Sequence, residues 1–350
     1  MENQPLNDQH IVITGCCGSV GSALVRRLLT DENYSKCRVV GLDNSEDGIF
    51  QIEEKWKDDT RGRFYVADVR DRESLRQRFA DADMVFHCAA LKHVYQCEKA
   101  PSEAVNTNIL GVESVIAAAR DAGVRRVLFT SSDKAVNPTN VMGTSKLMGE
   151  RLITAANASS HNGAIFASTR FGNVLGSRGS VIEVFRRQIA SGGPVTLTSP
   201  EMTRFVMNIE QAVALVLGSV SLARGGEVFI TKMPVIYVKD LAQVMIKNLA
   251  PRYGHDPDHI QICVVGARPG EKMYEELLTG EETRRAVELE EYFVVRPAFT
   301  PVYSRIHYEY PGLRSENVTR PYVSAEEPKL TAPDIQALLD QARLLDSLET

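Results

Sequence analysis

The sequence predicts an α/β fold built on a doubly wound parallel sheet (the Rossmann type), followed by a smaller C-terminal lobe. Two observations support this fold class. In the first half of the chain, apolar strand-like runs alternate with amphipathic helical patterns, and after Phe171 the composition changes. The first half contains six strand–helix steps, the number expected of a doubly wound dinucleotide-binding fold.

The elements of the first half are predicted from their patterns in turn. The strand runs are short and apolar, and the helical patterns repeat apolar residues every three or four positions. The expected strands are His10–Thr14, Cys37–Asp43, Arg63–Ala67, Met84–Cys88, Arg126–Ser131 and Ile165–Arg170. The expected helices between them are Ser19–Leu29, Arg72–Phe79, Ala104–Ala122 and Met142–Ala156.

The second half is less regular, because Gly, Pro, Arg and Thr become frequent. Its predicted elements are helices at Ile209–Ala223 and Val238–Ala250 and a strand at Ile260–Val265. We expect residues 1–172 to form the dinucleotide-binding domain and residues 173–300 to form a lobe, intertwined with it, that closes over a ligand. Residues 301–350 are predicted to be a largely irregular tail whose last helix begins near Ala332.

Composition and charge exclude several classes of protein. A net charge of −5 does not indicate a nucleic-acid-binding protein, so an anionic ligand has to be held by local basic residues. The polar N-terminus does not resemble a secretory signal, and no apolar run approaches the roughly 20 residues that span a bilayer. None of the six cysteines forms a CxxC pair. We therefore expect a cytoplasmic protein with reduced thiols, no membrane span and no metal site.

A glycine pattern marks the predicted cofactor loop. The first strand leads into Gly15, Gly18 and Gly21, and a helix follows at once. Glycines at this spacing allow a tight turn and let backbone amides approach a pyrophosphate, while the helix N-terminus adds partial positive charge. Ser19 and Val20, between the last two glycines, are expected to contact the cofactor as well.

Asp43 indicates which dinucleotide is bound. It ends the second strand, where a carboxylate can accept hydrogen bonds from both ribose hydroxyls and repel the extra phosphate of NADP. The simpler alternative is an aspartate that caps a turn at the end of a strand. Since no arginine lies in the segment Asn44–Asp47, the sequence favours NAD over NADP.

Further cofactor contacts are expected after the next strands. Asp68 and Val69 follow the third strand and fit an adenine contact, and the small residues Ala89 and Ala90 follow the fourth. Asn108 is expected on the long helix beneath the nicotinamide half. Each of these residues, considered alone, is better explained by a structural role. Only the order in which they follow one another along the chain supports a cofactor site.

The end of the fifth strand carries the candidate catalytic residues Ser132, Asp133 and Lys134. The following helix brings Met142 and Lys146, four positions apart and therefore on one helical face. In the short-chain dehydrogenase/reductase superfamily these two positions are normally Tyr and Lys. Here the lysine is kept and methionine replaces the tyrosine.

Five segments in order carry a more specific resemblance: Ala89–Val94, Asp133–Asn140, Phe171–Ser180, Met202–Phe205 and Arg268–Lys272. Together they resemble UDP-N-acetylglucosamine 4,6-dehydratases of the extended short-chain dehydrogenase/reductase superfamily, which act in bacterial polysaccharide synthesis. The similarity runs from about residue 8 to residue 300. Asp43 and Met142 resemble the capsule and O-antigen branch, whose larger members carry an N-terminal membrane region.

The resemblance implies a reaction in which hydride leaves carbon 4 of the hexose, water is eliminated across carbons 5 and 6, and the hydride returns to carbon 6. It makes Asp133 the acid at the carbon 6 hydroxyl, Lys134 the base at carbon 5, and Lys146 the residue that fixes the ribose. A thioether such as Met142 does not accept a proton. The base for the carbon 4 hydroxyl is therefore left open between Asp133, Lys134 and an ordered water.

The substrate implied by the resemblance is a UDP-sugar. Asn173, Arg204 and Arg268 are the expected phosphate ligands, with the two arginines as bidentate clamps. Glu271 is expected at the nucleotide ribose, and Lys92 and Arg178 at the sugar or phosphates, with Lys92 near the cofactor too. The alternative for Arg178 is an ordinary surface arginine.

Three other functions remain open from the sequence. A nucleotide-sugar 4-epimerase of the same fold shares the NAD site but does not need the adjacent Asp133 and Lys134. A non-catalytic NAD-binding protein shows no turnover, and an NADPH-consuming reductase is disfavoured by Asp43. Branch resemblance favours retention at carbon 5. We also expect a homo-oligomer, because proteins of this superfamily commonly pair through helices. The apolar face of Ala104–Ala122 either serves for such pairing or packs internally.

Overall fold

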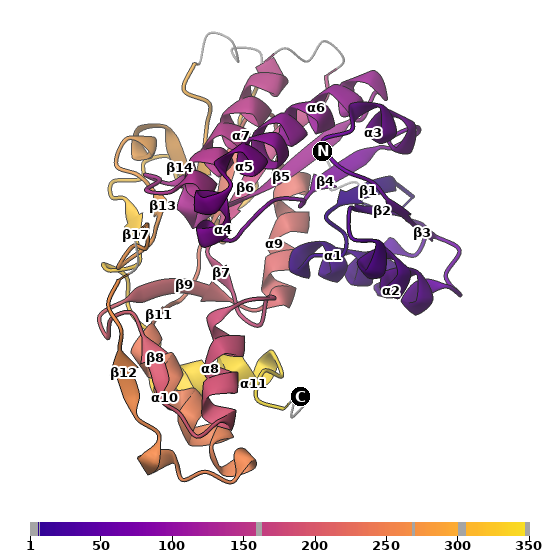
Figure 1. Cartoon of the computed structure of the whole chain (residues 1–350). Coiled ribbons are helices and arrows are strands. Elements are labelled where there is room, and N and C mark those ends of the chain that lie inside the picture. The colour runs from indigo at the N-terminus through magenta and orange to yellow at the C-terminus, as the bar shows by residue number, and fades with distance from the viewer. Residues whose placement is uncertain (1–5, 7, 159–162, 268–269, 300–305, 347–350) are drawn as a thin grey trace. The chain divides into compact units, whose positions relative to one another are not determined.

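The computed structural model describes residues 6, 8–158, 163–267, 270–299 and 306–346 and divides the chain into two compact units. The first unit consists of Met1–Arg170, Val213–Lys232 and Leu278–Pro321. The second unit consists of Phe171–Ala212, Met233–Leu277 and Tyr322–Thr350. Each unit therefore draws on three separate stretches of chain, which the colour gradient of Figure 1 lets the reader follow.

A mixed sheet organises the first unit. Within the described residues it has ten strands in the order β16-β14-β15-β10-β6-β5-β4-β1-β2-β3. Strand β1 pairs in parallel with β2 and β4, whereas β15 pairs antiparallel with β10 and β14. The strands are β1 His10–Thr14, β2 Arg38–Asp43, β3 Gly62–Val66, β4 Met84–His87, β5 Arg126–Ser132, β6 Ile165–Phe171, β10 Val228–Thr231, β14 Ala286–Leu289, β15 Tyr292–Val295 and β16 Leu313–Ser315. The predicted α/β class with a parallel sheet is confirmed.

The strand order reverses beside β1, because the chain moves outward to β2 and β3 on one side and to β4 and β5 on the other. Ligands of doubly wound sheets bind at the carboxyl ends of the strands at such a reversal. Residues Ile11, Val12 and Ile13 are fully buried, as expected of a central parallel strand that is covered on both faces.

The helices of the first unit largely follow the predicted pattern. In Figure 1, α6 and α7 run along the strands β4 to β6. The elements are α1 Ser19–Thr30, η1 Glu32–Tyr34, α2 Glu46–Trp56, α3 Arg72–Arg78, α4 Val94–Lys99, α5 Pro101–Val105, η2 Asn106–Leu110, α6 Gly111–Asp121, η3 Asp133–Ala135, α7 Val141–Ala158 and η6 Glu282–Arg285. Helix α9, Ile209–Leu222, spans the boundary at Val213. Among the described residues, no helix has the length and apolar character needed to cross a bilayer.

Two helical predictions differ from the structure. The predicted helix Ala104–Ala122 is divided into α5, the five-residue π-helical stretch η2, and α6. Such π-turns are frequent at functional sites, and this one contains Asn108. Helix α2 was not predicted, because only Ile49 and Ile52 of its 11 residues are buried and the apolar pattern is weak.

Within the described residues, the second unit contains small sheets and several helices around a hydrophobic core of its own. Strands β7, β9 and β11 form one sheet, β8 pairs with β12, and β13 pairs with β17. The strands are β7 Asn173–Val174, β8 Val195–Leu197, β9 Thr203–Met207, β11 Val235–Tyr237, β12 Ile262–Val264, β13 Glu276–Leu278 and β17 Tyr322–Val323. The helical elements are α8 Val181–Ala190, α10 Val238–Leu249, η4 Pro251–Tyr253, η5 Pro257–His259 and α11 Ala332–Gln341.

The units do not follow the continuous ranges that the sequence predicted. Residues 213–232 and 278–321 belong to the first unit, although 173–300 was expected to be one lobe and 301–350 a tail. The reason is strand pairing: β10 lies beside β6 in parallel, and β15, β14 and β16 extend the same sheet from there. The last helix begins at Ala332, as predicted.

Candidate cofactor and active site

The loop after β1 has the geometry of a phosphate cradle. Gly15 has a φ of +72°, and a Cβ added to it would lie 2.6 Å from the amide nitrogen of Ala89. A Cβ on Gly21 would lie 2.1 Å from the carbonyl oxygen of Gly15. The loop backbone therefore passes directly against the chain after β4 and the first turn of α1. Gly18 is the N-cap of α1, and its lack of a side chain keeps the helix N-terminus accessible to an anion.

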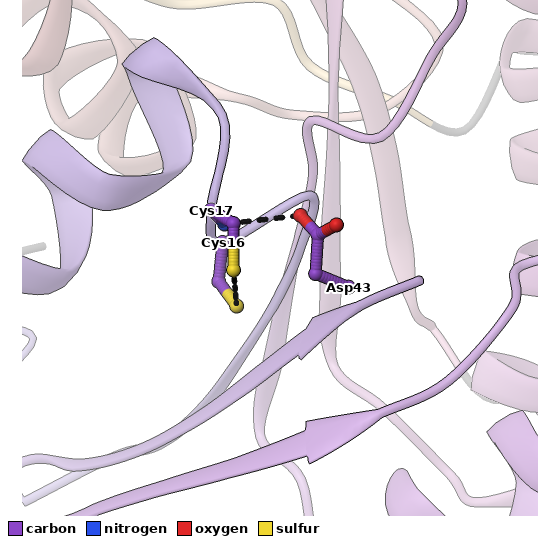
Figure 2. Close-up of side chains that lie close together, drawn as sticks. All are labelled: Cys16, Cys17 and Asp43. Atoms are coloured by element: carbon purple, nitrogen blue, oxygen red, sulfur yellow. Dashed lines mark hydrogen bonds between the residues drawn. The ribbon is translucent and has the colours of Figure 1, made fainter. Parts of the chain in front are cut away.

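Asp43 lies at the rim of this loop, as Figure 2 shows. Its Oδ2 accepts a hydrogen bond of 3.0 Å from the Cys17 amide, and its Oδ1 accepts one of 3.0 Å from the Ser45 amide. Beside it, the sulfur atoms of Cys16 and Cys17 are 3.9 Å apart. The hydrogen bond to Cys17 and burial both raise the pKa of Cys16, so this thiol is protonated at neutral pH.

The residues after β3 and β4 line the next positions along the same sheet edge. The amide of Ala67 donates to the carbonyl of Asp43, which brings the start of the Asp68 segment next to β2. The Asp68 carboxylate is paired with Arg70 at 2.6 Å, and that hydrogen bond lowers its pKa. This pairing competes with the predicted adenine contact. Val69 is buried against Gly111.

Three further predicted residues, Ala89, Ala90 and Lys92, follow β4. Ala89 and Ala90 are half-buried, Lys92 is exposed, and the amide of Ala89 lies 3.4 Å from Oγ1 of Thr14. Ser19 and Val20, in the first turn of α1, are half-buried.

Asn108 has a bridging position inside the first unit. Its Oδ1 accepts from the Leu91 amide at 2.8 Å, and its Nδ2 donates to the Leu91 carbonyl and to Oγ of Ser145, each at 2.9 Å. Only 1% of the residue is exposed. Asn108 therefore joins the loop after β4 to α7, one residue before Lys146. These contacts make it a residue that positions its neighbours.

The candidate catalytic residues Ser132, Asp133 and Lys134 are brought together where β5 ends and η3 begins. The Ser132 hydroxyl donates to Oδ1 of Asp133 at 2.5 Å, and Nζ of Lys134 lies 3.2 Å from both carboxylate oxygens. The Asp133 side chain is 1% exposed and that of Lys134 is 33% exposed. The pair thus combines a buried carboxylate with a lysine that reaches solvent.

Lys146 lies deeper in the first unit. Its Nζ donates to the carbonyl of Thr130 at 2.9 Å and lies 4.5 Å above the ring of Phe129. Burial lowers the pKa of Lys146 to about 8. Met142, one turn earlier on α7, is 3% exposed and packs with Cys97 and Ala104. Its surroundings are apolar, as expected of a side chain that transfers no proton.

Two residues at this site were not predicted. His87 ends β4 and is fully buried, with Nδ1 2.7 Å from Oγ1 of Thr14. Burial and, secondly, the charge of Lys146 lower its pKa to about 3, so the ring is neutral. Gly143, in the first turn of α7, lies so close to the chain at Lys134 that an added Cβ would be 2.2 Å from the Lys134 carbonyl oxygen. A histidine inside an apolar strand run and a glycine inside a helical pattern were the available signals.

In the second unit, Glu275 joins two of the predicted phosphate ligands. Nδ2 of Asn173 donates to its two carboxylate oxygens at 2.8 and 3.1 Å, and Nε of Arg204 lies 3.2 Å from one of them. Glu275 is 5% exposed, and its amide donates to Oγ of Ser324 at 2.9 Å. This glutamate was not predicted from the sequence, although it lies just beyond the segment Arg268–Lys272.

Two of the other predicted substrate residues, both in the second unit, lie at the surface. Arg178 is exposed in the loop before α8. Glu271 is exposed as well, and its carboxylate accepts a hydrogen bond of 3.2 Å from Oγ1 of Thr198. Arg268 lies outside the described residues. Within the second unit, the structure therefore brings together Asn173 and Arg204, through Glu275.

The residues around the glycine loop fit a dinucleotide. The glycines leave space where Cβ atoms would clash, and Asp43 is held at the loop by two backbone amides. Among the described residues, Nε2 of His87 and Oγ of Ser131 are buried without a hydrogen-bond partner. Buried polar atoms in proteins usually have partners, so these two atoms are consistent with a ligand at this edge of the sheet.

Curated relatives carry several names. A protein of Methanocaldococcus jannaschii, named an uncharacterized membrane protein, is 47% identical over 291 residues, which are 83% of this chain and 86% of that protein. A UDP-glucose 4-epimerase of Rickettsia canadensis is 36% identical and covers 95% of each chain. A UDP-N-acetylglucosamine 4,6-dehydratase (inverting) of Campylobacter jejuni is 35% identical over 83% of this chain and 84% of its own.

Solved structures show the same fold. Pen from Bacillus thuringiensis superimposes with a TM-score of 0.87 at 36% identity, covering 97% of this chain and 99% of its own. A dTDP-glucose 4,6-dehydratase from Streptomyces venezuelae, solved with NAD bound, has a TM-score of 0.66 at 23% identity and covers 75% and 86% of the two chains. The family model described as polysaccharide biosynthesis protein matches residues 11–297. The chain thus belongs to this polysaccharide biosynthesis family and has the fold of the extended short-chain dehydrogenases/reductases.

Proposed function

We propose that the protein is an NAD-dependent 4,6-dehydratase that converts UDP-N-acetylglucosamine to a UDP-4-keto-6-deoxyhexosamine for glycan synthesis. The observation that carries this proposal is the paired Asp133 and Lys134 at the end of β5. Elimination of water needs one group that donates a proton and one that accepts a proton at neighbouring carbons. The relatives named as 4,6-dehydratases support the same reaction.

The cofactor residues proposed from the sequence divide into four roles. The loop from Gly15 to Gly21 binds the pyrophosphate, and Asp43 accepts from the ribose. Lys146 fixes the nicotinamide ribose, and Ala89 and Ala90 leave room for the cofactor backbone. With NAD bound, these residues would hold the group that supplies hydride acceptance at carbon 4 and hydride donation at carbon 6.

The ion pair has a direct chemical meaning in this proposal. Nζ of Lys134 lies 3.2 Å from the Asp133 carboxylate, so a proton that moves between them leaves a neutral acid and a neutral amine. The neutral acid donates to the departing carbon 6 hydroxyl, and the amine takes the carbon 5 proton. The pair is then charged again. The ammonium returns a proton to carbon 5 when hydride reaches carbon 6, and the proton that the carbon 4 hydroxyl released earlier, to Asp133, Lys134 or an ordered water, makes up this loss.

The second unit holds the nucleotide diphosphate in this proposal. Asn173 and Arg204 now bond Glu275 and backbone carbonyls, and in this proposal they exchange some of these hydrogen bonds for bonds to phosphate oxygens. Arg268 and Arg178 are further cationic ligands, and Glu271 is at the ribose. Lys92, in the first unit, stays a predicted contact of the sugar or phosphates. Retention at carbon 5, a homo-oligomeric state and a cytoplasmic location stay predictions.

A mass and proton NMR analysis of the product made from UDP-N-acetylglucosamine in deuterated water tests the proposal. We expect loss of one water, deuterium at carbon 5 and no net reduction of added NAD. Asp133→Asn and Lys134→Met should each lower kcat at least 100-fold, in line with the loss of an acid or base. Lys57→Met, which removes a lysine that is 63% exposed, should leave kcat unchanged. Full turnover by both pair variants would refute the proposal.

A 4-epimerase is the second candidate, favoured by relatives of that name which match 95% of the chain. An epimerase also oxidises carbon 4, but it returns the hydride to the same carbon. Its product has the mass of the substrate and a new configuration at carbon 4. The same NMR experiment distinguishes the two reactions, because an epimerase eliminates no water and exchanges no hydrogen at carbon 5.

A further inference from the structure

Cys16 and Cys17 in the cofactor loop and Asp43 at the end of β2 form a cluster of side chains of the kind that bind metal ions (Figure 2). The proposed reaction uses neither thiol. We propose that these three side chains bind a thiophilic divalent cation of the zinc and cadmium type, in competition with the dinucleotide. The metal site rests on the three residues alone, whereas the competition also rests on the proposed role of Asp43 at the ribose.

The distances suit such an ion. The two sulfur atoms are 3.9 Å apart, and the ligand atoms of all three residues lie within 4.8 Å of one another. Two thiolates at about 2.3 Å from a tetrahedral zinc ion are about 3.8 Å from each other. The cysteine pair therefore has the right separation before any ion arrives, and an Asp43 carboxylate oxygen, within 4.8 Å of both sulfur atoms, is the third ligand.

A disulfide is a poorer use of the same pair. Adjacent Cα atoms are about 3.8 Å apart, below the range of about 4.4–6.8 Å found in ordinary disulfides. The sulfur atoms, 3.9 Å apart, would have to approach to about 2.05 Å. A bridging ion removes this conflict because it keeps the sulfurs at their present separation.

Neighbouring glycines provide the space for the sulfurs. A Cβ added to Gly41 on β2 would lie 2.9 Å from Sγ of Cys16, and a Cβ added to Gly48 on α2 would lie 2.9 Å from Sγ of Cys17. The backbone around the pair thus accommodates both thiols side by side. Asp43, the most exposed of the three ligands, gives an incoming ion its first contact.

Charge and proton balance are satisfied when the ion binds. The two thiols lose their protons to solvent, and the divalent cation is bound by two thiolates and one carboxylate. Water completes the tetrahedron, as in other sites with three protein ligands. The Asp43 oxygens that face the ion are then unavailable to ribose hydroxyls, so ion and dinucleotide exclude each other.

Cadmium titration of the full-length protein tests the site, read by the ultraviolet thiolate-to-cadmium charge-transfer band. We expect one equivalent of Cd²⁺ to saturate the band in nucleotide-free protein. Cys16→Ser and Cys17→Ser should each abolish tight binding, and Asp43→Asn should weaken it at least tenfold. Cys263→Ser, which removes a half-buried thiol of the second unit, is the matched control and should keep the full band. Circular dichroism of each variant checks that it is folded. If Cys16→Ser does not fold, Cys16→Ala replaces it in the titration.

Competition is tested by repeating the titration with saturating NAD, which should raise the Cd²⁺ midpoint at least tenfold. A band that persists in the Cys16→Ser and Cys17→Ser variants would overturn the site. If saturating NAD left the midpoint of the Cd²⁺ titration unchanged, the proposal that the ion and the dinucleotide compete for Asp43 would be wrong. Neither readout uses turnover, so a failed metal site and a failed dehydratase assay are separate results.

Discussion

Met142 is the residue that the resemblance described above leads us to expect in place of a catalytic tyrosine, and its contacts indicate how the side chain is used. It is 3% exposed and packs with Cys97 and Ala104, at the start of the helix that carries Lys146. A thioether in such surroundings contributes packing and takes no part in proton transfer.

Replacement of Met142 by leucine should therefore change little. We expect Met142→Leu to keep kcat within about threefold and stability within about 1.5 kcal/mol, because the swap nearly conserves volume. Met142→Tyr adds atoms to a filled cluster and should cost about 1–3 kcal/mol. Steady-state kinetics and urea unfolding measure both effects. A loss of more than 100-fold in kcat for the leucine variant would mean that the sulfur has a chemical role.

His87 should make stability depend on acid. Its pKa is about 3 when folded, whereas an unfolded histidine titrates near 6.5, so the unfolded chain binds more protons between these values. Stability is therefore lost as pH falls from 6.5 towards 3. Between pH 7 and pH 5 the contribution of His87 falls by about 2 kcal/mol.

Urea unfolding at the two pH values checks this prediction. His87→Gln should show a smaller loss of stability on acidification than the unmodified protein. His259→Gln, at a side chain that is 85% exposed, should behave like the unmodified protein. Equal acid sensitivity of the two variants would contradict the assignment to His87.

A buried charge network links three elements of the first unit. Arg170 at the end of β6 bonds Glu150 on α7 at 2.7 and 3.0 Å and Glu282 on η6 at 3.1 Å. The Arg170 side chain is 1% exposed. Burial alone would raise the pKa of Glu282, but the positive charge of Arg170 outweighs burial and lowers this pKa to about 2.

Arg170→Met should destabilise the protein by about 3–5 kcal/mol, because it leaves two buried carboxylates without a cation. Arg314→Met is the matched control. It removes an arginine that is 56% exposed and paired with Glu290 on the surface, and it should cost less than about 1 kcal/mol. Urea unfolding of the two variants gives the comparison, and equal costs would mean that the buried network does not hold these elements together.

Glu275 is expected to act through Asn173 and Arg204. Glu275→Gln removes the charge that both residues share, so we expect UDP to bind at least tenfold more weakly while NAD affinity is unchanged. KM should rise more than kcat falls, because the phosphates are remote from the reacting carbons. Glu326→Gln, at an exposed glutamate of the second unit, should leave both affinities as they are. Isothermal titration calorimetry with UDP and with NAD measures the two affinities separately.

Prediction from sequence succeeded where one local pattern determines an element. The runs that became β1, β4 and β6 are apolar and bounded by turn residues, so their places were found within a residue or two. Glu275 and His87 could not be assigned in this way, because each acquires its role from partners distant in sequence: Glu275 from Asn173, and His87 from Thr14. The Asp133–Lys134 pair was predictable because its two members are adjacent.

At the scale of the whole molecule, ligands should stabilise the unit that binds them. NAD at 100 times its dissociation constant should raise the free energy of unfolding of the first unit by about 2.7 kcal/mol. NADP at the same concentration should have much less effect, because the Asp43 carboxylate repels its extra phosphate. Thermal unfolding with each cofactor measures the difference. Asp43→Asn should reduce the difference between the stabilisation by NAD and the stabilisation by NADP. If both cofactors stabilised the unmodified protein equally, the predicted preference for NAD would be wrong.

The division of the chain was the least predictable property of the molecule. Residues 213–232 read as part of a C-terminal lobe, yet they include β10, which pairs with β6. The residues of β10 and β6 carry no local pattern that identifies them as partners. Backbone hydrogen bonds would be satisfied equally well by any other strand edge of suitable length.

The interleaved path also bears on how the protein is made. When a ribosome has completed Arg170, the inner strands β1 to β6 exist, but β10, the neighbour of β6, begins only at Val228. The nascent sheet therefore presents an unpaired edge while the second unit is still being synthesised, and such edges invite pairing with other chains. Synthesis must pass the last strand of the sheet, β16 at Leu313–Ser315, before the cofactor-binding unit is complete. Chaperones that cover strand edges should accordingly raise the yield of this protein more than they raise that of a protein whose domains are contiguous.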